Sequence, residues 1–323
     1  MNVVALAGGV GGAKLADGLA RALPPNNLTV IVNTGDDFEH FGLIICPDLD
    51  TVCYTLAGRA NPVTGWGRVN ETWKALETVG ELGGPTWFRL GDGDLGLHLE
   101  RTRRLRSGES LSQVTRRVCL AWNIGPYILP MSDDEAPTSV YTMELGELPF
   151  QEYFVHHQCQ PHVTGFRYRG EERACPAPGV LDALQNASLV VICPSNPWVS
   201  VAPILALPGV RATLQTQRVI AVSPIIGGKA VKGPAAKMFA ELGIEPSAIS
   251  VARHYSSLLT GFVLDDVDRE QAGMVQALGV RPMVFNTLMS TVDDRLRLAL
   301  QVLEFGEKLE KPPQSPIKER VQG

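Results

Sequence analysis

The sequence lacks long apolar runs and paired cysteines. No stretch approaches the roughly 18 apolar residues that a membrane-spanning helix needs. No charged leader precedes the first apolar run, Asn2 to Ala7, and that run is too short for a signal peptide. The six cysteines are scattered without a CxxC pair, so we interpret them as reduced thiols in the core. Together these absences predict a cytoplasmic protein without a membrane anchor.

A strong excess of one charge is also missing. The chain carries 29 Lys and Arg against 34 Asp and Glu, a net charge of −5, which argues against broad binding to nucleic acid or to an anionic membrane. The composition does supply 45% hydrophobic residues, enough for a large core without disulfides or a structural metal. We expect one domain over residues 1–309 and a frayed tail over 310–323, where no periodicity remains.

Short β-branched runs alternate with helical patterns along the chain. The clearest runs are Val3–Ala7, Leu28–Asn33, Leu189–Cys193, Val219–Ser223 and Gly261–Leu264. Strands that alternate with helices, and that are apolar nearly throughout, are typical of a parallel sheet buried on both faces. The pattern therefore predicts an α/β fold with a doubly wound, mostly parallel, Rossmann-like sheet.

Two segments depart from this alternation. Residues 52–125 show helical spacing, including a capping box from Ser110 to Gln113, and predict a helical insertion after the second strand. Residues 139–169 alternate in polarity and predict a small β excursion. A second capping box predicts that the last helix starts at Thr291.

A glycine-rich segment follows the first strand and precedes a predicted helix over Leu15–Leu23. Without Cβ atoms the backbone can approach an anion, and a helix N-terminus favours phosphate. The segment is neither a P-loop nor a GxGxxG motif, because Leu15 follows the lysine and Lys14 stands where the third glycine would be. A tight turn without a ligand is the simpler alternative. The candidate phosphate-binding residues are Gly8, Gly9, Gly11, Gly12 and Lys14.

Acidic residues gather after the second strand. Asp36 and Asp37 end the segment NTGDD, and Asp48 and Asp50 follow in PDLDT. Carboxylates brought together in this way repel each other unless a proton or a cation intervenes, and Mg²⁺ takes one or two carboxylates plus substrate phosphates. Two alternatives are that Asp36 holds a ribose and that Asp48 only caps a helix starting near Leu49.

A third polar segment begins at Arg89 and runs through GDGD to His98. Arg89 is placed to contact a phosphate or an electron-rich ring oxygen, whereas Asp94 is explained equally well as a helix cap. The arginines at positions 101, 103, 104 and 106 are interpreted as a solvated helix face.

Two further strand ends carry small polar residues. Ser195 and Asn196 follow one strand and Ser223 another, at the edge where open α/β sheets bind ligands. These residues favour a nucleotide pocket. The segment His156–His162 fits no standard zinc spacing, and we interpret it as a polar strand edge.

Together these motifs resemble the 2-phospho-L-lactate transferase family, whose actinobacterial members are phosphoenolpyruvate transferases of the same pathway. The matching segments run in family order from residue 3 to about residue 305. They are GGVGGAK, VNTGDD, CPDLDTV, GWGRVNETW, RLGDGDLGLH, LPMSDD, CPSNPWVS, SPIIGGKAVKGPAAK and NTLM.

The resemblance implies a magnesium-dependent phosphotransferase of coenzyme F-420 biosynthesis, and a homodimer. A 2-phospholactyl, phosphoenolpyruvyl or related three-carbon group would move from a diphospho-guanosine donor to the ribityl hydroxyl of the deazaflavin alcohol Fo, releasing GMP. It assigns Asp50 and Arg89 to Fo, the glycine segment and both serine turns to the GDP part of the donor, and Asp36 and Asp48 to Mg²⁺. Asp50 is also our candidate to take the ribityl proton.

Two other functions remain open. One is a regulatory, nucleotide-sugar-binding protein of the gluconeogenesis-factor branch, and the intact PDLDTV and LGDGDLGLH segments favour the transferase over it. The other is an NAD-dependent oxidoreductase, which the broken GxGxxG pattern and the acidic cluster disfavour.

Overall fold

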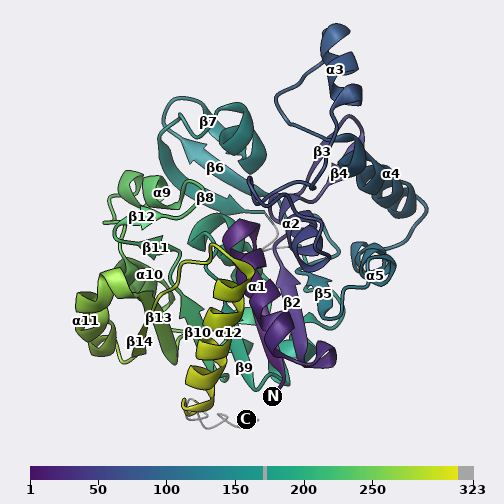
Figure 1. The fold of residues 1–323 in the computed structure, drawn as a ribbon. Coiled ribbons are helices and arrows are strands. Elements are labelled where there is room, and N and C mark those ends of the chain that lie inside the picture. The colour runs from purple at the N-terminus through teal and green to yellow at the C-terminus, as the bar shows by residue number, and fades with distance from the viewer. Residues whose placement is uncertain (170–172, 312–323) are drawn as a thin grey trace, which may run out of the picture.

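The computed structural model describes residues 1–169 and 173–311, and within these ranges seven strands form one central sheet (Figure 1). Every neighbouring pair is parallel, and the order is β14-β13-β10-β9-β1-β2-β5. The strands are β1 (Val3–Ala7), β2 (Leu28–Val32), β5 (Tyr127–Pro130), β9 (Leu189–Ile192), β10 (Val219–Val222), β13 (Gly261–Asp265) and β14 (Arg281–Phe285). The predicted doubly wound α/β sheet is confirmed, with β5 and β14 added to the five strands expected.

Helices cover both faces of this sheet, because alternate strand residues feed two separate cores. Val3 and Ala5 face one core, whereas Val4 and Leu6 face the other. The first core packs against α1 (Gly9–Ala22), α2 (Pro47–Leu56), α5 (Leu111–Ala121) and α12 (Val292–Glu307). The second packs against α6 (Val180–Gln185), α7 (Ala202–Ala206), α8 (Val210–Leu214), α9 (Ala235–Glu241), α10 (Ala248–Tyr255) and α11 (Ala272–Ala277).

Two excursions leave the central sheet. Between β2 and β5 come the hairpin β3 (Phe38–His40) and β4 (Leu43–Ile45), then α2, α3 (Lys74–Glu81), α4 (Asp92–Arg106) and α5. Figure 1 shows α3 at the tip of an extension beyond the body of the molecule. Between β5 and β9, the strands β6 (Thr138–Thr142), β7 (Gly146–Pro149) and β8 (Val163–Tyr168) pair antiparallel in the order β7-β6-β8.

The predicted helix starts are right in two places and wrong in one. Both capping boxes form, from Ser110 to Gln113 and from Thr291 to Asp294. The first helix, however, begins at Gly9 rather than at Leu15, so most of the glycine segment is its first turn. Of the predicted tail, residues 312–323 lie outside the described part of the chain. No helix in that described part is long and apolar enough to cross a membrane.

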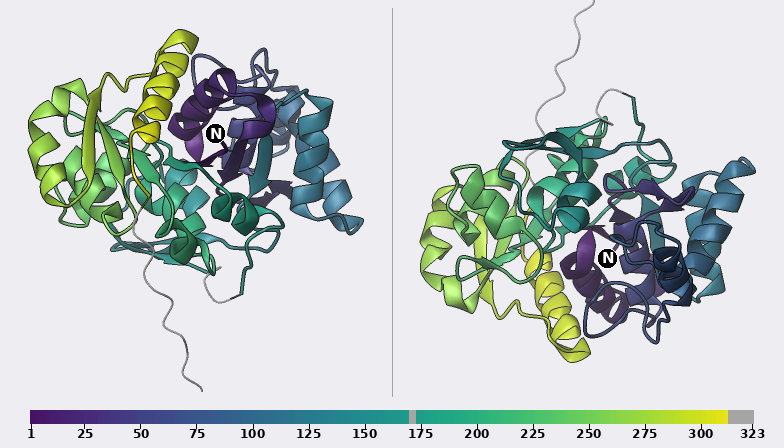
Figure 2. Two further views of the ribbon diagram at one scale, coloured as in Figure 1. Left: turned by 90° about the horizontal axis from the view of Figure 1, so that it is seen from below. Right: turned by 90° about the horizontal axis from the view of Figure 1, so that it is seen from above.

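The helices α1 and α12 lie side by side on one face of the sheet, as both views of Figure 2 show. Gly18 makes this close approach possible, because a Cβ atom there would lie 2.1 Å from the backbone oxygen of Arg295. Beside it, the buried carboxylate of Asp17 accepts hydrogen bonds from Arg21 at 3.1 Å and from Arg295 at 3.0 Å.

We therefore expect Gly18→Ala to lower the free energy of unfolding by about 1–3 kcal/mol, because α12 must move to admit the methyl group. Gly96→Ala is the matched control. Gly96 is also inside a helix, but a Cβ atom there would meet nothing within 4 Å, so alanine should stabilise by up to about 1 kcal/mol. Urea denaturation measures both, and equal effects of the two substitutions would contradict the close packing of α1 on α12.

Candidate functional site

A cavity of about 840 Å³ opens at the carboxyl edge of the sheet. Its lining includes the residues that follow four neighbouring strands: Gly8 after β1, Asp36 after β2, Ser195 after β9 and Ser223 after β10. The strand order reverses between β1 and β9, and open α/β sheets bind ligands at such a switch point. The cavity is within the size range of small-molecule sites.

The glycine segment packs the start of α1 tightly against the end of β9. A Cβ on Gly11 would lie 2.2 Å from the oxygen of Pro194, and one on Gly12 would lie 2.5 Å from Ser195 Oγ. Gly8 donates its N–H to Ser195 Oγ at 3.1 Å, and the same hydroxyl donates to Gly8 O at 2.8 Å. The cavity lining includes Gly8, Gly9, Gly11 and Lys14 but not Gly12, where the close approach of Ser195 leaves no room for a side chain.

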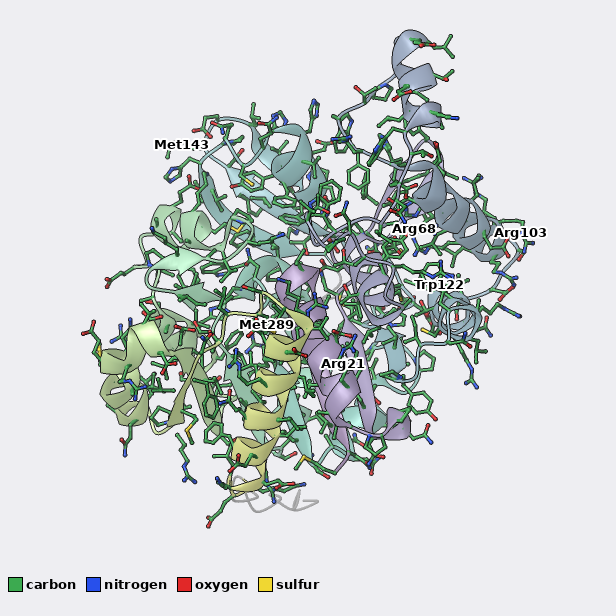
Figure 3. The ribbon with its side chains drawn as sticks, viewed as in Figure 1. Arg21, Arg68, Arg103, Trp122, Met143 and Met289 are labelled. Atoms are coloured by element: carbon green, nitrogen blue, oxygen red, sulfur yellow. The ribbon has the colours of Figure 1, made fainter. Side chains whose placement is uncertain are left out.

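Lys14 brings positive charge to this side of the cavity. Its Nζ donates to Met289 O at 2.7 Å, and Met289, labelled in Figure 3, also lines the cavity. Burial, followed by repulsion from Arg295 and Lys232, lowers the pKa of Lys14. An anion in the cavity would relieve that repulsion, so this half of the cavity suits a phosphate.

The predicted serine and asparagine residues line the cavity, but their side chains are engaged in local turns. Ser223 Oγ donates to Ile225 O at 2.8 Å and accepts from Ile225 N–H at 3.1 Å. The side chain of Asn196 accepts from Trp198 N–H at 3.0 Å. Together with Ser195, these residues fix the shape of the wall at the ends of β9 and β10.

The acids Asp36 and Asp48 face each other across Asn33. The amide nitrogen of Asn33 donates to Asp36 Oδ1 at 3.2 Å and to Asp48 Oδ2 at 2.9 Å. Gln151 Nε2 donates to the other oxygen of Asp36, Oδ2, at 3.0 Å. Gly9 N–H donates to the other oxygen of Asp48, Oδ1, at 2.5 Å. Asp48 is therefore not the helix cap, since α2 begins at Pro47 with Cys46 as its N-cap. Sequence reasoning missed Asn33 and Gln151.

Buried charge is only partly compensated in this acid pair. Burial raises the pKa of Asp36 well above its ordinary value, and repulsion from Asp48 and Asp37 adds to the effect. Burial likewise raises the pKa of Asp48 to about 6. A divalent cation would relieve this repulsion. Within residues 1–169 and 173–311 no three His, Cys, Asp or Glu side chains converge on one metal position, so phosphate oxygens would have to complete the ligand set.

Asp50 is paired with Arg101, against our expectation of a solvated arginine face. The two terminal nitrogens of the Arg101 guanidinium, Nη1 and Nη2, donate to the two carboxylate oxygens of Asp50, Nη1 at 3.1 Å. Arg101 is only 3% exposed, and Asp50 with its other neighbours holds the pKa of the guanidinium above its ordinary value despite burial. Arg103 on the same helix is 61% exposed at its side chain, so the prediction of a solvated face is right for it and wrong for Arg101.

A pattern in the sequence does point to Arg101. Asp94, His98 and Arg101 stand at i, i+4 and i+7, and this spacing puts them on one face of α4. All three are buried. Asp94 is also not the helix cap, because α4 begins at Asp92 with Gly91 as its N-cap.

Arg89 lies at the outer end of the cavity. It is exposed, and its guanidinium lies over the Trp73 ring, 4.4 Å from the ring centre. Its neighbours Trp87 and Phe88 line the cavity too, and the Trp87 ring stacks on His156 at 5.2 Å. This half of the cavity is aromatic, in contrast to the glycine and lysine half.

We expect Arg101→Leu to lower the free energy of unfolding by about 3–5 kcal/mol, because it leaves the buried Asp50 carboxylate without its partner. Arg103→Leu is the matched control and should cost no more than about 1 kcal/mol, since its ion pair with Glu100 is exposed. In the double variant Asp50→Asn/Arg101→Leu, part of the loss should be recovered. Additive losses in chemical denaturation would argue against a coupled pair.

The pH dependence of stability should report on His98. Burial lowers the pKa of His98 to about 4 from an ordinary value of 6.5, and its Nδ1 lies 3.3 Å from the Arg101 guanidinium. Because the unfolded chain takes up the proton first, stability falls as the pH drops from about 6.5 to about 4, by up to about 3 kcal/mol. In His98→Asn this contribution should vanish. Parallel stability–pH curves for the two proteins would disprove the assignment.

Comparison with known proteins identifies the class to which this fold and site belong. The family described as 2-phospho-L-lactate transferase CofD matches residues 3–284. The chain is 44% identical over 316 residues to a phosphoenolpyruvate transferase of Streptomyces griseus, covering 96% of this chain and 99% of that protein. It is 39% identical over 319 residues to a phosphoenolpyruvate transferase of Mycobacterium sp. strain KMS, covering 91% and 96%.

A solved structure supports the fold independently. A Bacillus halodurans protein described as a member of the UPF0052 family superposes with a TM-score of 0.62, covering 94% of this chain and 98% of that chain. At 14% identity this likeness shows the fold alone.

The class is therefore that of α/β transferases with a ligand cavity at the switch point of a parallel sheet. The chain belongs to the 2-phospho-L-lactate transferase CofD family, as its motifs indicated.

Proposed function

We propose that this protein transfers a phosphate-linked three-carbon acid from a diphospho-guanosine donor to the ribityl hydroxyl of the deazaflavin alcohol Fo, releasing GMP, in coenzyme F-420 biosynthesis. The phosphoenolpyruvyl group is our first candidate, because similar relatives carry that name. One observation carries the proposal. A single cavity joins one half, lined by Lys14 and the start of α1, to an aromatic half next to Arg89 and Asp50.

The donor occupies the first half in this proposal. The first turn of a helix leaves N–H groups without intrahelical partners and carries a partial positive charge, so the start of α1 attracts the diphosphate. Lys14 adds a full charge beside it. The turns at Ser195, Asn196 and Ser223 form the adjoining wall, and we assign them to the guanosine part of the donor.

The acceptor occupies the second half. In this proposal a flat deazaflavin ring packs against aromatic side chains such as Trp87 and Phe88, with Arg89 at one end and the Asp50–Arg101 pair at the other. In-line transfer of the phosphorus from the bridging oxygen of the diphosphate to the acceptor hydroxyl depends on placement and on charge neutralisation more than on covalent catalysis. Holding both substrates in one cavity supplies the placement.

Magnesium belongs to this proposal as the cofactor of the transfer. Asp36 and Asp48 would hold it, with Asn33 and Gln151 fixing the orientation of their carboxylates. When bound, Mg²⁺ neutralises charge on the phosphates of the donor. The raised pKa values of both acids and the limited number of protein ligands agree with a cation that is shared with a substrate.

The direct test incubates the protein with Fo, Mg²⁺ and each candidate diphospho-guanosine donor, and analyses the products by mass spectrometry. We expect GMP and Fo that has gained the three-carbon acid phosphate, with the enolpyruvyl donor preferred. Binding of nucleotide sugars without any turnover would instead favour the regulatory alternative.

Asn33→Ala tests the metal site. Loss of the amide that orients both carboxylates should raise the Mg²⁺ concentration needed for half-maximal activity by about 10- to 100-fold. Asn286→Ala is the control, because Asn286 is an exposed amide that does not belong to the cavity lining. An unchanged Mg²⁺ requirement in Asn33→Ala would remove the assignment of Asp36 and Asp48 to the metal.

A further inference from the structure

Asp94 is a buried acid in the acceptor half of the cavity. It lies in the first turn of α4, is 7% exposed and belongs to the cavity lining. It shares this lining with the two residues assigned to the acceptor, Arg89 and Asp50. Arg89 comes shortly before it on the same segment, and Asp50 is close enough to repel its charge.

One oxygen of Asp94 is held and the other is not. The Tyr54 hydroxyl donates to Oδ1 at 2.6 Å. In the part of the chain that the structure describes, Oδ2 accepts no hydrogen bond, and it is not one of the buried polar atoms that lack a partner, so it still contacts the cavity. Asp50 differs, because both of its oxygens accept from the Arg101 guanidinium.

Tyr54 is itself held rigidly. Its ring stacks on Trp122 at 5.5 Å, and the Arg68 guanidinium lies over the Tyr54 ring at 5.9 Å from its centre; Figure 3 labels both partners. Arg68 also donates to Gly93 O at 2.8 Å, so the same arginine contacts both the Tyr54 ring and the first turn of α4. The direction of the Asp94 carboxylate is therefore fixed before any substrate binds.

The charged groups around Asp94 come from three elements. Tyr54 and Asp50 face it from α2, Glu71 and Arg68 from the loop before α3, and His98 from the next turn of α4. Burial raises the pKa of Asp94 to about 6, with repulsion from Asp50 and Glu71 adding to it, while the Tyr54 hydrogen bond and Arg68 act in the opposite direction. His98 is neutral at pH 7, because burial lowers its pKa to about 4.

We propose that Asp94, rather than Asp50, accepts the proton of the acceptor hydroxyl during transfer, while the Asp50–Arg101 pair positions the acceptor. This inference rests on the proposed function. The hydroxyl proton passes to Asp94 Oδ2 as the hydroxyl oxygen forms a bond to the distal phosphorus of the donor. The bond from that phosphorus to the bridging oxygen breaks, its electron pair leaves with GMP, and the proton is later released to water.

A free carboxylate oxygen suits this role better than one bound to a guanidinium. A proton acceptor needs an open lone pair at hydrogen-bond distance from the hydroxyl, and it works best when its pKa lies near the operating pH. Asp94 has an open oxygen in the cavity and a pKa of about 6, whereas protonation of Asp50 would have to break its bidentate pair with Arg101.

The test measures kcat and kcat/KM against pH with saturating donor and saturating Mg²⁺, so that protonation of Asp48, whose pKa is also raised to about 6, adds no acid limb of its own. In the wild type, kcat/KM should fall below a pH of about 6, where Asp94 takes up a proton. Asp94→Asn should lower kcat by about 10²- to 10⁴-fold and remove this acid limb, and Asp94→Glu should restore part of both. Asp92→Asn is the control, since Asp92 lies on the same turn of α4 outside the cavity lining and should leave the limb in place.

Two neighbouring substitutions should move the limb in opposite directions. Tyr54→Phe removes the hydrogen bond that lowers the pKa of Asp94, so the limb should shift to higher pH. Glu71→Gln removes a like charge, so the limb should shift to lower pH. A purely structural role of Asp94 would not produce two shifts of opposite sign.

The outcomes separate this inference from the proposed function. Asp50→Asn should chiefly raise KM for the acceptor and keep the acid limb, shifted to lower pH because a like charge next to Asp94 is lost. If Asp50→Asn abolishes the limb while Asp94→Asn retains it, Asp50 is the proton acceptor and our inference is wrong, although the transfer stands. A wild-type protein that forms no GMP from any of the donors would overturn both.

Discussion

Buried negative charge at the carboxyl edge of the sheet is the constraint on which the rest of the site depends. Asp36, Asp48 and Asp50 come within 15 residues of chain and are all buried there. Each charged carboxylate loses its hydration on folding, and only charge-assisted contacts can offset that cost. The guanidinium of Arg101 neutralises Asp50, whereas the other two acids receive neutral donors. The charge of Asp50 is therefore balanced within the protein, whereas the charge of Asp36 and Asp48 is left for a bound cation to balance.

This constraint also explains the glycines better than phosphate binding alone. Gly8 has no room for a side chain, because a Cβ would lie 2.4 Å from Asp48 Oδ2 and 2.6 Å from Ser200 Cβ. Gly9 then donates its N–H to the other oxygen of Asp48. The start of α1 thus stabilises an acid of the protein with one N–H group and offers its positive end to a ligand anion at the same time.

The sequence predicts an element well where the pattern lies within the element itself, and poorly where contacts with distant residues decide. The buried strands β1, β9 and β10 are continuous apolar runs, so they were predictable to within about one residue. The strand β14 was missed, since it contains Pro282 and is only half-buried at an edge of the sheet. The glycines were interpreted as a turn before a helix over Leu15–Leu23, whereas the helix begins at Gly9 and its tight packing on Pro194 demands glycine inside it.

The candidate site shows the same limit. The acids and the glycines were recognised as residue types in a motif, and the fold brings them to one cavity. Their partners were not recognised, because Asp50 and Arg101 are 51 residues apart and lie on different helices. A run of four arginines looks like a solvated face until the helix is placed, and only the i, i+4, i+7 spacing of Asp94, His98 and Arg101 separates the buried one.

The spacing of Asp94 and Arg101 on α4 links the positions of two carboxylates, Asp94 itself and Asp50, the partner of Arg101. Because α4 carries both Asp94 and Arg101 on its buried face, the placement that brings the guanidinium to Asp50 also brings Asp94 into the cavity. Two acids that share a site cannot both be charged without cost, and here the cation is delivered to only one of them. Asp50 is therefore bound by both of its oxygens to Arg101, while Asp94 keeps an open oxygen and a pKa of about 6. The division of labour between the two acids follows from where one helix places one arginine.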